Sequence, residues 1–222
     1  MKGPVITRDN VETIVDKKFI RVFDLQYAEG KHYFDATRRS LDDLAAIKTE
    51  EDFKKMLPDA VSCIVIIKLP GKEPLLLLSY EYRYPAGRFL LGVPAGLLDK
   101  ADEAEENPIA ATAIREIHEE TGIVVDLSKD TVEVLNPLLF STPGMKDESN
   151  ALVKVVLNLE NLDQLTQEGA EGQECFDGFC LLTKEEAKEI LKNGVDANGH
   201  FYSVYTWAAL MCFVNYVCHN ID

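Results

Sequence analysis

Runs of hydrophobic residues alternate with polar stretches along this chain and predict strands interleaved with helices. Two runs, 19–25 and 31–39, are separated by Glu29 and Gly30 and predict an N-terminal β-hairpin. Longer runs rich in Val, Ile and Leu predict strands at 60–69, 74–82, 131–140, 151–159 and 175–182. Strands on both sides of a central helix indicate an α/β fold, specifically an α/β/α sandwich with a mixed sheet and a hairpin extension.

The central helix has clear start and stop signals. Asn107 followed by Pro108 is typical of an N-cap with proline at the first helical position. Gly122 is typical of a C-terminal cap, so we expect the helix to span 108–121.

Helices are also predicted before and after this one in the sequence. Thr183 and Glu186 have the spacing of a capping box, which predicts that a helix begins there. Apolar positions predict further helices at 40–57 and 204–217. The last segment is shorter than the roughly 20 apolar residues that cross a bilayer, so we expect it to be buried, in the core or at a subunit interface.

Three carboxylates crowd one face at the end of the central helix. Glu116, Glu119 and Glu120 lie within one turn of each other, and like charges at such spacing cost about 0.2 to 0.5 kcal/mol per pair. The helix dipole also disfavours anions at a helix C-terminus. A divalent cation removes both penalties, and oxygen donors without a nearby Cys suit Mg²⁺ or Mn²⁺ rather than Zn²⁺. The alternative is a solvated acidic helix edge.

Composition narrows the class of protein. With 222 residues, of which 46% are hydrophobic, the chain is long enough for one sizeable core, which we expect at 59–222, with an extension at 1–58. A net charge of −15 argues against nucleic acid as a partner, because binding to the phosphate backbone depends on Lys and Arg. The five cysteines lack metal-ligand spacing and are expected to be reduced. No apolar leader follows Met1, so we expect a cytoplasmic location and no membrane partner.

The glutamates belong to a longer motif. The loop before the helix contains Val93-Pro94-Ala95-Gly96, and the helix ends with Arg115-Glu116-Ile117-His118-Glu119-Glu120-Thr121-Gly122-Ile123. This series resembles the Nudix box and matches its second half at every specified position. The first half departs, because the loop is about five residues longer than in the family pattern. Candidates for the first box glutamate are Asp102, Glu103, Glu105 and Glu106.

The wider chain resembles one branch of that family, the ADP-ribose pyrophosphatases. The hairpin, the motif Glu81-Tyr82-Arg83-Tyr84-Pro85 after an apolar strand, and the turn Thr142-Pro143-Gly144 all look like that branch. The resemblance implies a homodimer that hydrolyses a nucleoside diphosphate sugar with Mg²⁺ or Mn²⁺, with ADP-ribose giving AMP and ribose 5-phosphate. Another nucleotide substrate and a nucleotide-binding domain without catalysis remain open alternatives.

The resemblance also implies roles around the metal. Glu116 and Glu120 would be the main ligands, with Glu119 and the carbonyl oxygen of Ala95 as further ones. Arg115 would hold a box glutamate in place.

A general base is expected in a loop after the box. Glu174 is the first choice, Glu171 the second and Glu148 the third. The alternative for each is a solvated loop acid.

Substrate contacts are implied for a further group of residues. Arg83 stands where the family places an arginine that binds the diphosphate. Phe19, Phe34 and Arg39 belong to the region that in this branch crosses to a partner subunit and helps to form the nucleobase pocket, although core packing is an alternative for the aromatic rings. Gly96 and Glu148 complete the predicted set of substrate-binding residues.

Overall fold

The computed structural model describes residues 3–99, 101–169 and 174–215, and the chain divides into two compact units. The first unit comprises Met1–Asp59 and Leu138–Asn150. The second comprises Ala60–Pro137 and Ala151–Asp222.

Within the described residues of the second unit, seven strands form one sheet. The strand order is β10-β5-β4-β9-β8, with β6 paired to β5 and β7 paired to β4. The strands are β4 (Ala60–Lys68), β5 (Leu75–Arg83), β6 (Arg88–Gly92), β7 (Ala95–Leu97), β8 (Thr131–Phe140), β9 (Ser149–Asn158) and β10 (Phe176–Leu182). The five strands expected here from the sequence are confirmed, with ends that differ by at most two residues.

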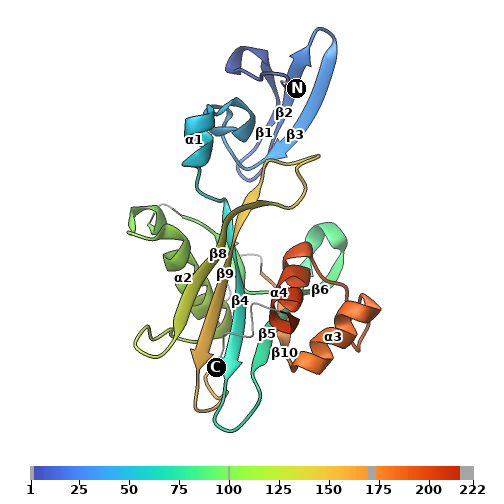
Figure 1. The fold of residues 1–222 in the computed structure, drawn as a ribbon. Coiled ribbons are helices and arrows are strands. Elements are labelled where there is room, and N and C mark those ends of the chain that lie inside the picture. Colours follow the sequence, from blue (N-terminus) through green and yellow to red (C-terminus); the bar gives the residue numbers. More distant parts are fainter. Residues whose placement is uncertain (1–2, 100, 170–173, 216–222) are drawn as a thin grey trace. The chain divides into compact units, whose positions relative to one another are not determined.

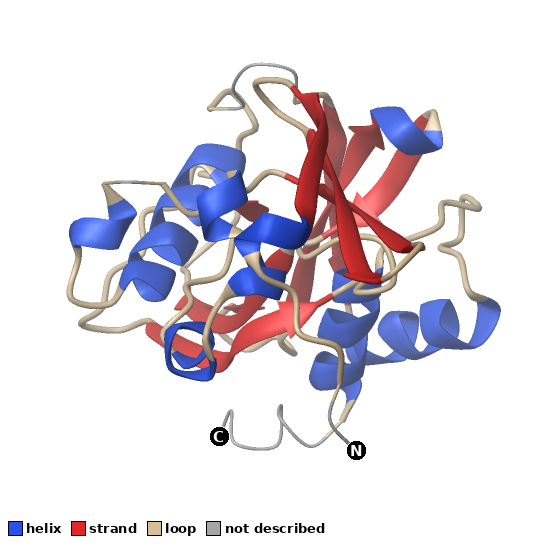
Figure 2. Cartoon of the chain, turned by 90° about the horizontal axis from the view of Figure 1, so that it is seen from above, coloured by secondary structure: helices blue, strands red, loops and turns tan. Residues whose placement is uncertain are grey.

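Helices cover both faces of this sheet (Figure 1), and Figure 2 separates them from the strands by colour. Alternate residues of β4 face opposite ways, so Val61 and Cys63 pack with Ile117 of α2 (Pro108–Thr121) in the main core. Ile64 and Ile66 are also fully buried and extend to the other face, where α4 (Val204–Val214) contacts β4. The predicted α/β/α sandwich with a mixed sheet is confirmed.

The caps explain where these helices begin and end. The side chain of Asn107 accepts a hydrogen bond from the N–H of Ala110 at 3.2 Å, and Gly122 ends α2 with a φ of 72°. Thr183 and Glu186 cap each other reciprocally at the start of α3 (Lys184–Asn193). The helix α4 ends at Val214, and the last predicted residues of that segment lie outside the described residues.

Within residues 3–99, 101–169 and 174–215, no helix combines the length and the hydrophobicity needed to span a bilayer.

The first unit contains a sheet in which three strands can be described: β1 (Val11–Asp16), β2 (Arg21–Ala28) and β3 (Lys31–Thr37). The predicted hairpin is confirmed as β2 and β3, and Gly30 occupies the turn with a φ of 63°. The strand β1 was not predicted. Only its two valines are partly buried, so its sequence lacks the alternation that marks a half-buried strand.

The predicted helix at 40–57 is wrong. The segment instead contains two short 3₁₀ turns, Leu41–Asp43 and Ala45–Ile47, and a short helix α1 (Glu50–Lys54). Leu44, between the turns, is extended (φ −55°, ψ 134°) and fully buried with Phe23. Packing of Leu44 into the core of the first unit therefore overrides the helical pattern.

Candidate active site

Arg115 gathers carboxylates from two segments of the second unit. Its Nη1 lies 2.7 Å from Oε1 of Glu116 and 2.8 Å from Oε2 of Glu119. Its Nη2 donates to Oδ2 of Asp102 at 2.9 Å and to the carbonyl oxygen of Leu97 at the same distance. The arginine thus ties the end of α2 to the loop between β7 and the helix.

Asp102 is the acid of the lengthened loop that faces Arg115. It is the sixth residue after Gly96, lies in a 3₁₀ turn (Asp102–Ala104), and is buried. Burial alone would raise the pKa of this carboxyl, but hydrogen bonds from Arg115, Asp99 and Thr112, together with the charge of Arg115, outweigh burial and lower the pKa below the usual value. Among the four candidates for the first box acid, the geometry favours Asp102.

The two buried glutamates of this site, Glu116 and Glu120, have raised pKa values. Glu120 is 4% exposed and accepts a hydrogen bond from the N–H of Ala95 at 3.2 Å. Burial, and then the charges of neighbouring glutamates, raise the pKa of Glu120 well above its usual value. Burial also raises the pKa of Glu116 to about 7, although Arg115 opposes the shift. Two buried carboxylates of like charge are costly unless a cation accompanies them.

Gly96 lies directly against Glu116. A Cβ atom added to Gly96 would lie 1.9 Å from the carboxyl carbon of Glu116. The absence of a side chain at Gly96 therefore makes room for the carboxylate.

These residues suit a hard divalent cation by their chemistry. The donors are carboxylate oxygens, the kind of ligand that Mg²⁺ and Mn²⁺ prefer. No three Asp, Glu, His or Cys side chains in the described part of the chain are already grouped as a metal site. The reason is that Glu116 and Glu119 turn toward the guanidinium of Arg115, which neutralises them. The donor set fits a cation by the chemistry of its oxygen atoms.

The register of β5 and β10 brings two further predicted residues together. Phe176 pairs with Glu81, and the N–H of Tyr82 donates to the carbonyl oxygen of Cys175 at 2.8 Å. Glu174 precedes Cys175 and Arg83 follows Tyr82, so both lie just beyond this pair, at the same end of the two strands.

The charge of Glu174 also acts on the glutamates of α2. After burial and the effect of Arg115, its negative charge contributes to the raised pKa of Glu116. It contributes likewise to that of Glu120, where burial is again the largest cause. The predicted base, the predicted diphosphate-binding arginine and the box carboxylates therefore belong to one acidic centre.

Sequence reasoning missed one member of this centre, Glu81. Its carboxylate lies 2.5 Å from Arg83, and burial raises its pKa, partly offset by Arg83. The signal in the sequence was the spacing of Glu81 and Arg83, because residues two apart on a strand share a face.

The model of the NUDIX domain matches residues 56–204 of this chain. The chain belongs to the NUDIX domain family. It is 27% identical over 185 residues to an ADP-sugar pyrophosphatase of Mus musculus, covering 81% of this chain and 80% of the mouse protein. It is 31% identical over 123 residues to an ADP-ribose pyrophosphatase of Saccharomyces cerevisiae, covering 53% of this chain and 49% of the yeast protein.

The chain spans about half of the length, or less, of several of the curated relatives that it matches. A crystal structure of an ADP compounds hydrolase is similar in fold, with a TM-score of 0.52 and 19% identity. The aligned region covers 95% of this chain and 91% of the chain in that crystal structure.

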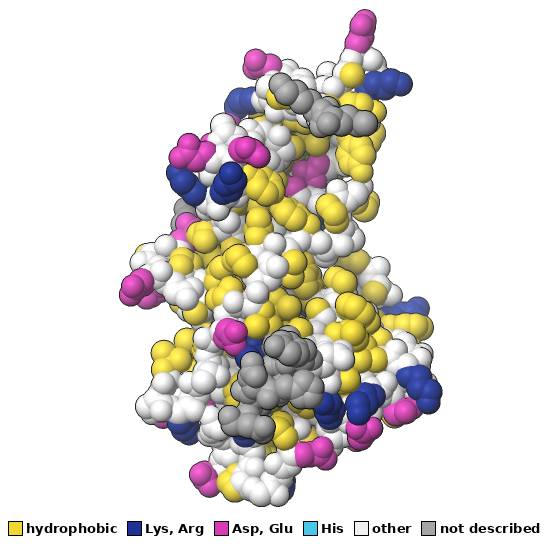
Figure 3. Space-filling view, viewed as in Figure 1, with side chains coloured by type: hydrophobic (Ala, Val, Ile, Leu, Met, Phe, Trp, Pro, Cys, Tyr) yellow, Lys and Arg dark blue, Asp and Glu magenta, His cyan; other side chains and the backbone are white. Residues whose placement is uncertain are grey.

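Four predicted residues of this NUDIX protein lie in the first unit rather than in the second. Phe19 and Phe34 are 67% and 57% exposed, and hydrophobic side chains are visible on the surface of this unit (Figure 3). Glu148 forms ion pairs with Arg38 at 3.4 Å and with Lys146 at 3.3 Å. The base candidate Glu171 lies outside the described residues.

Arg39, the fourth of these residues, is buried in the first unit. Its guanidinium is 2.7 Å from Asp59 and 3.2 Å from Asp43, and its side chain is 7% exposed. Both terminal nitrogens of its guanidinium therefore bond to carboxylates of its own unit.

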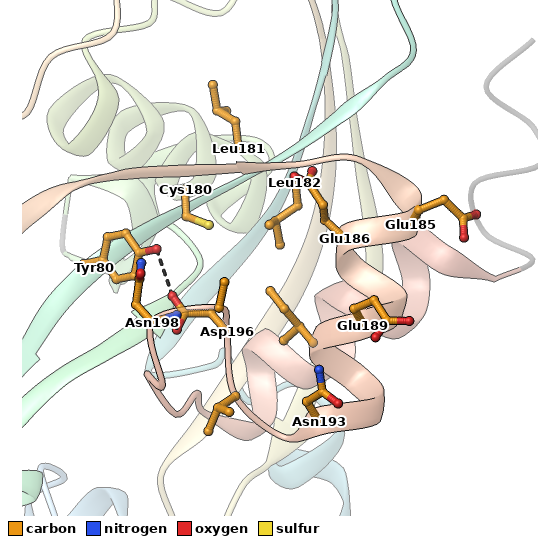
Figure 4. A pocket seen from close by; sticks show the side chains of 13 residues that line it. Tyr80, Cys180, Leu181, Leu182, Glu185, Glu186, Glu189, Asn193, Asp196 and Asn198 are labelled. Atoms are coloured by element: carbon orange, nitrogen blue, oxygen red, sulfur yellow. Dashed lines mark hydrogen bonds between the residues drawn. The ribbon is translucent and has the colours of Figure 1, made fainter.

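A cavity of about 470 Å³ opens between β10 and α3 of the NUDIX domain (Figure 4). The hydroxyl of Tyr80 donates to Asp196 at 2.9 Å on one side, and Glu185, Glu186 and Glu189 line the other. Tyr80 and Glu81 are adjacent on β5 and extend to opposite faces, so the cavity lies on the face away from Arg83. Among the described residues, the cavity is lined by carboxylates and by no Lys or Arg that could bind an anionic diphosphate.

Gly96→Ala is expected to lower kcat/KM for hydrolysis at this site by about 100-fold, because the new methyl group displaces the carboxylate of Glu116 and a shift of about 1 Å at a reacting centre has that effect. Steady-state kinetics with Mg²⁺ would measure this. Gly92→Ala is the matched control, since its Cβ would meet nothing closer than 3.8 Å. Normal activity of Gly96→Ala would argue against Glu116 as a metal ligand.

Proposed function

We propose that this protein hydrolyses the diphosphate linkage of nucleoside diphosphate sugars with Mg²⁺ or Mn²⁺, converting ADP-ribose to AMP and ribose 5-phosphate. The observation that carries the proposal is the convergence of Arg83, Glu174 and the box glutamates in one acidic centre. The similarity to ADP-sugar and ADP-ribose pyrophosphatases supports the substrate class.

Within this proposal, Glu116, Glu119, Glu120 and the carbonyl oxygen of Ala95 hold the metal. A bound divalent ion neutralises phosphoryl oxygens and lowers the pKa of water. Arg115 fixes Glu116 and Glu119 through its ion pairs and acts as a positioning residue.

The chain's own residues then handle the substrate and the proton. Arg83 binds the diphosphate with its guanidinium fork. Glu174 accepts the proton of the water whose oxygen attacks one phosphorus atom, and the bond from that phosphorus to the bridging oxygen breaks. AMP and ribose 5-phosphate are the two products, and the proton leaves Glu174 to solvent.

We also propose a homodimer in which Phe19 and Phe34 contribute to a nucleobase pocket. The support is their exposure, because large aromatic side chains are costly to leave in water and stack well on bases.

The test is incubation with Mg²⁺ and a panel of ADP-ribose, ADP-glucose, GDP-mannose, NADH, diadenosine polyphosphates and nucleoside triphosphates, with AMP and phosphate-ester products followed by chromatography. We expect ADP-ribose to be cleaved fastest, with AMP as product. Fastest cleavage of another compound would change the substrate. Silence across the panel, together with binding of a nucleotide, would replace hydrolysis with a binding function.

A further inference from the structure

Glu81 has no role in the proposed reaction so far, although it lies inside the acidic centre. It precedes Arg83 by two residues on β5, so both side chains leave the same face of the strand. Oε2 of Glu81 lies 2.5 Å from Nη2 of Arg83. The side chain of Glu81 is 13% exposed and that of Arg83 is 49% exposed. A largely buried carboxylate therefore contacts an arginine that is still partly exposed to solvent and to ligands.

The neighbouring strand β6 supports the backbone of Glu81 from the side. Glu81 pairs with Leu90 of β6, so the backbone of Glu81 is held between two neighbouring strands. The guanidinium of Arg83 has five N–H donors, so a bond to Glu81 leaves several for another anion. Arginine is also suited to bidentate recognition of phosphate because its fork is planar and rigid.

We propose that Glu81 is a positioning residue that holds the guanidinium of Arg83 in the orientation in which it binds the diphosphate. The inference rests on the proposed function and names a determinant of substrate binding at that site. A carboxylate beside a phosphate-binding arginine also reduces the local positive charge, which by itself weakens anion binding. We expect the gain from orientation to exceed the loss from charge, because an arginine that is already held in place loses less conformational freedom when it binds the diphosphate.

A double-mutant cycle separates orientation from charge. The variants are Glu81→Ala, Glu81→Gln, Arg83→Ala and the double variant with both alanines. Glutamine is the matched control, because its carbonyl oxygen can accept the same hydrogen bond while its charge is zero. Binding of a non-hydrolysable α,β-methylene analogue of ADP-ribose would be measured by calorimetry with Mg²⁺ present.

We expect Glu81→Ala and Arg83→Ala each to weaken binding of the analogue by about 10- to 100-fold, as for the loss of one charge-assisted hydrogen bond. The double variant should bind no more weakly than Arg83→Ala, because both changes remove one contact. Glu81→Gln should bind within about threefold of the wild type, since a neutral acceptor keeps most of the orientation. In ¹⁵N NMR spectra, the Nη2–H signals of Arg83, which face Glu81, should lose their protection from exchange in Glu81→Ala and keep it in Glu81→Gln.

Other outcomes overturn the inference. Additive losses in the cycle would mean that Glu81 acts independently of Arg83. Equal losses in Glu81→Ala and Glu81→Gln, with a raised Mg²⁺ requirement, would make Glu81 a metal ligand. Tighter binding in both variants would mean that charge dominates. A wild-type protein that binds the analogue but releases no AMP from ADP-ribose would overturn the proposed function alone, because the cycle would still report on Arg83.

Discussion

Glu120→Gln is expected to lose about 1,000-fold or more of the hydrolysis of ADP-ribose while the protein itself becomes more stable. Glutamine preserves the shape and the acceptor for the N–H of Ala95, but it removes the negative charge that we assign to the metal. Several kcal/mol of transition-state stabilisation by a metal correspond to about this loss of rate.

The gain in stability has a separate cause. Glu120 is 4% exposed, and burial raises the pKa of its carboxyl far above the usual value, so its ionised form opposes folding. With EDTA at pH 8, Glu120→Gln should therefore melt at a higher temperature than the wild type. The control is Glu119→Gln, because that side chain is 37% exposed and its charge is a smaller burden. Retained hydrolysis in Glu120→Gln would contradict its role as a metal ligand.

The pH dependence of the wild type in EDTA follows from the same electrostatics. The pKa of Glu116 is about 7 in the folded protein, against 4.5 as its ordinary value, so the folded state holds this proton more tightly. The contribution of Glu116 to stability is then greatest below pH 4.5 and is lost as the pH rises through 7, a change on the order of 3 kcal/mol. Mg²⁺ should reverse the trend, since it binds the deprotonated carboxylates and stabilises the folded state most above pH 7. Chemical unfolding at several pH values, with and without Mg²⁺, would measure both slopes.

Arg39→Met is expected to destabilise the first unit by about 3 to 5 kcal/mol, as measured for the loss of one partner from a buried ion pair. The change leaves Asp59, 2.7 Å from the guanidinium, without its cation in a buried setting, and Asp147 at 3.6 Å loses its counter-charge as well. Methionine fills similar space but offers no charge. Amide hydrogen exchange in β2 and β3 is the appropriate measurement, because the single tryptophan, Trp207, lies in the second unit.

The neighbouring residue supplies the control for this experiment. Arg38 is 49% exposed and pairs with Glu148 at 3.4 Å, so Arg38→Met should change stability by less than about 1 kcal/mol. If Arg39 served mainly to bind substrate, as its place after the hairpin suggested, Arg39→Met would raise KM and leave the exchange rates unchanged. That result would contradict a structural role.

The local features of this protein were predictable where each depended on residues close together in sequence. Asn107, Pro108 and Gly122 set the ends of α2, because caps act through hydrogen bonds to the nearest turn. The strands β4 and β9 were predictable because burial on both faces produces continuous apolar runs. The spacing of Glu116, Glu119 and Glu120 on that helix likewise indicated a shared acidic face before any contact was known.

Only the tertiary structure decided matters that depend on pairing between distant segments. Asp102 emerged from four loop acids because it alone of them has an ion pair to Arg115 within the described residues. Glu174 came close enough to act on the charges of Glu81 and Glu120 because β10 pairs with β5, a pairing between segments far apart in sequence. Burial of Leu44 likewise broke the expected helix at 40–57, since helix propensity is worth less per residue than a buried leucine. Sequence alone thus determined the chemistry of the box and the elements that carry it, and long-range packing chose the partners of each charged group.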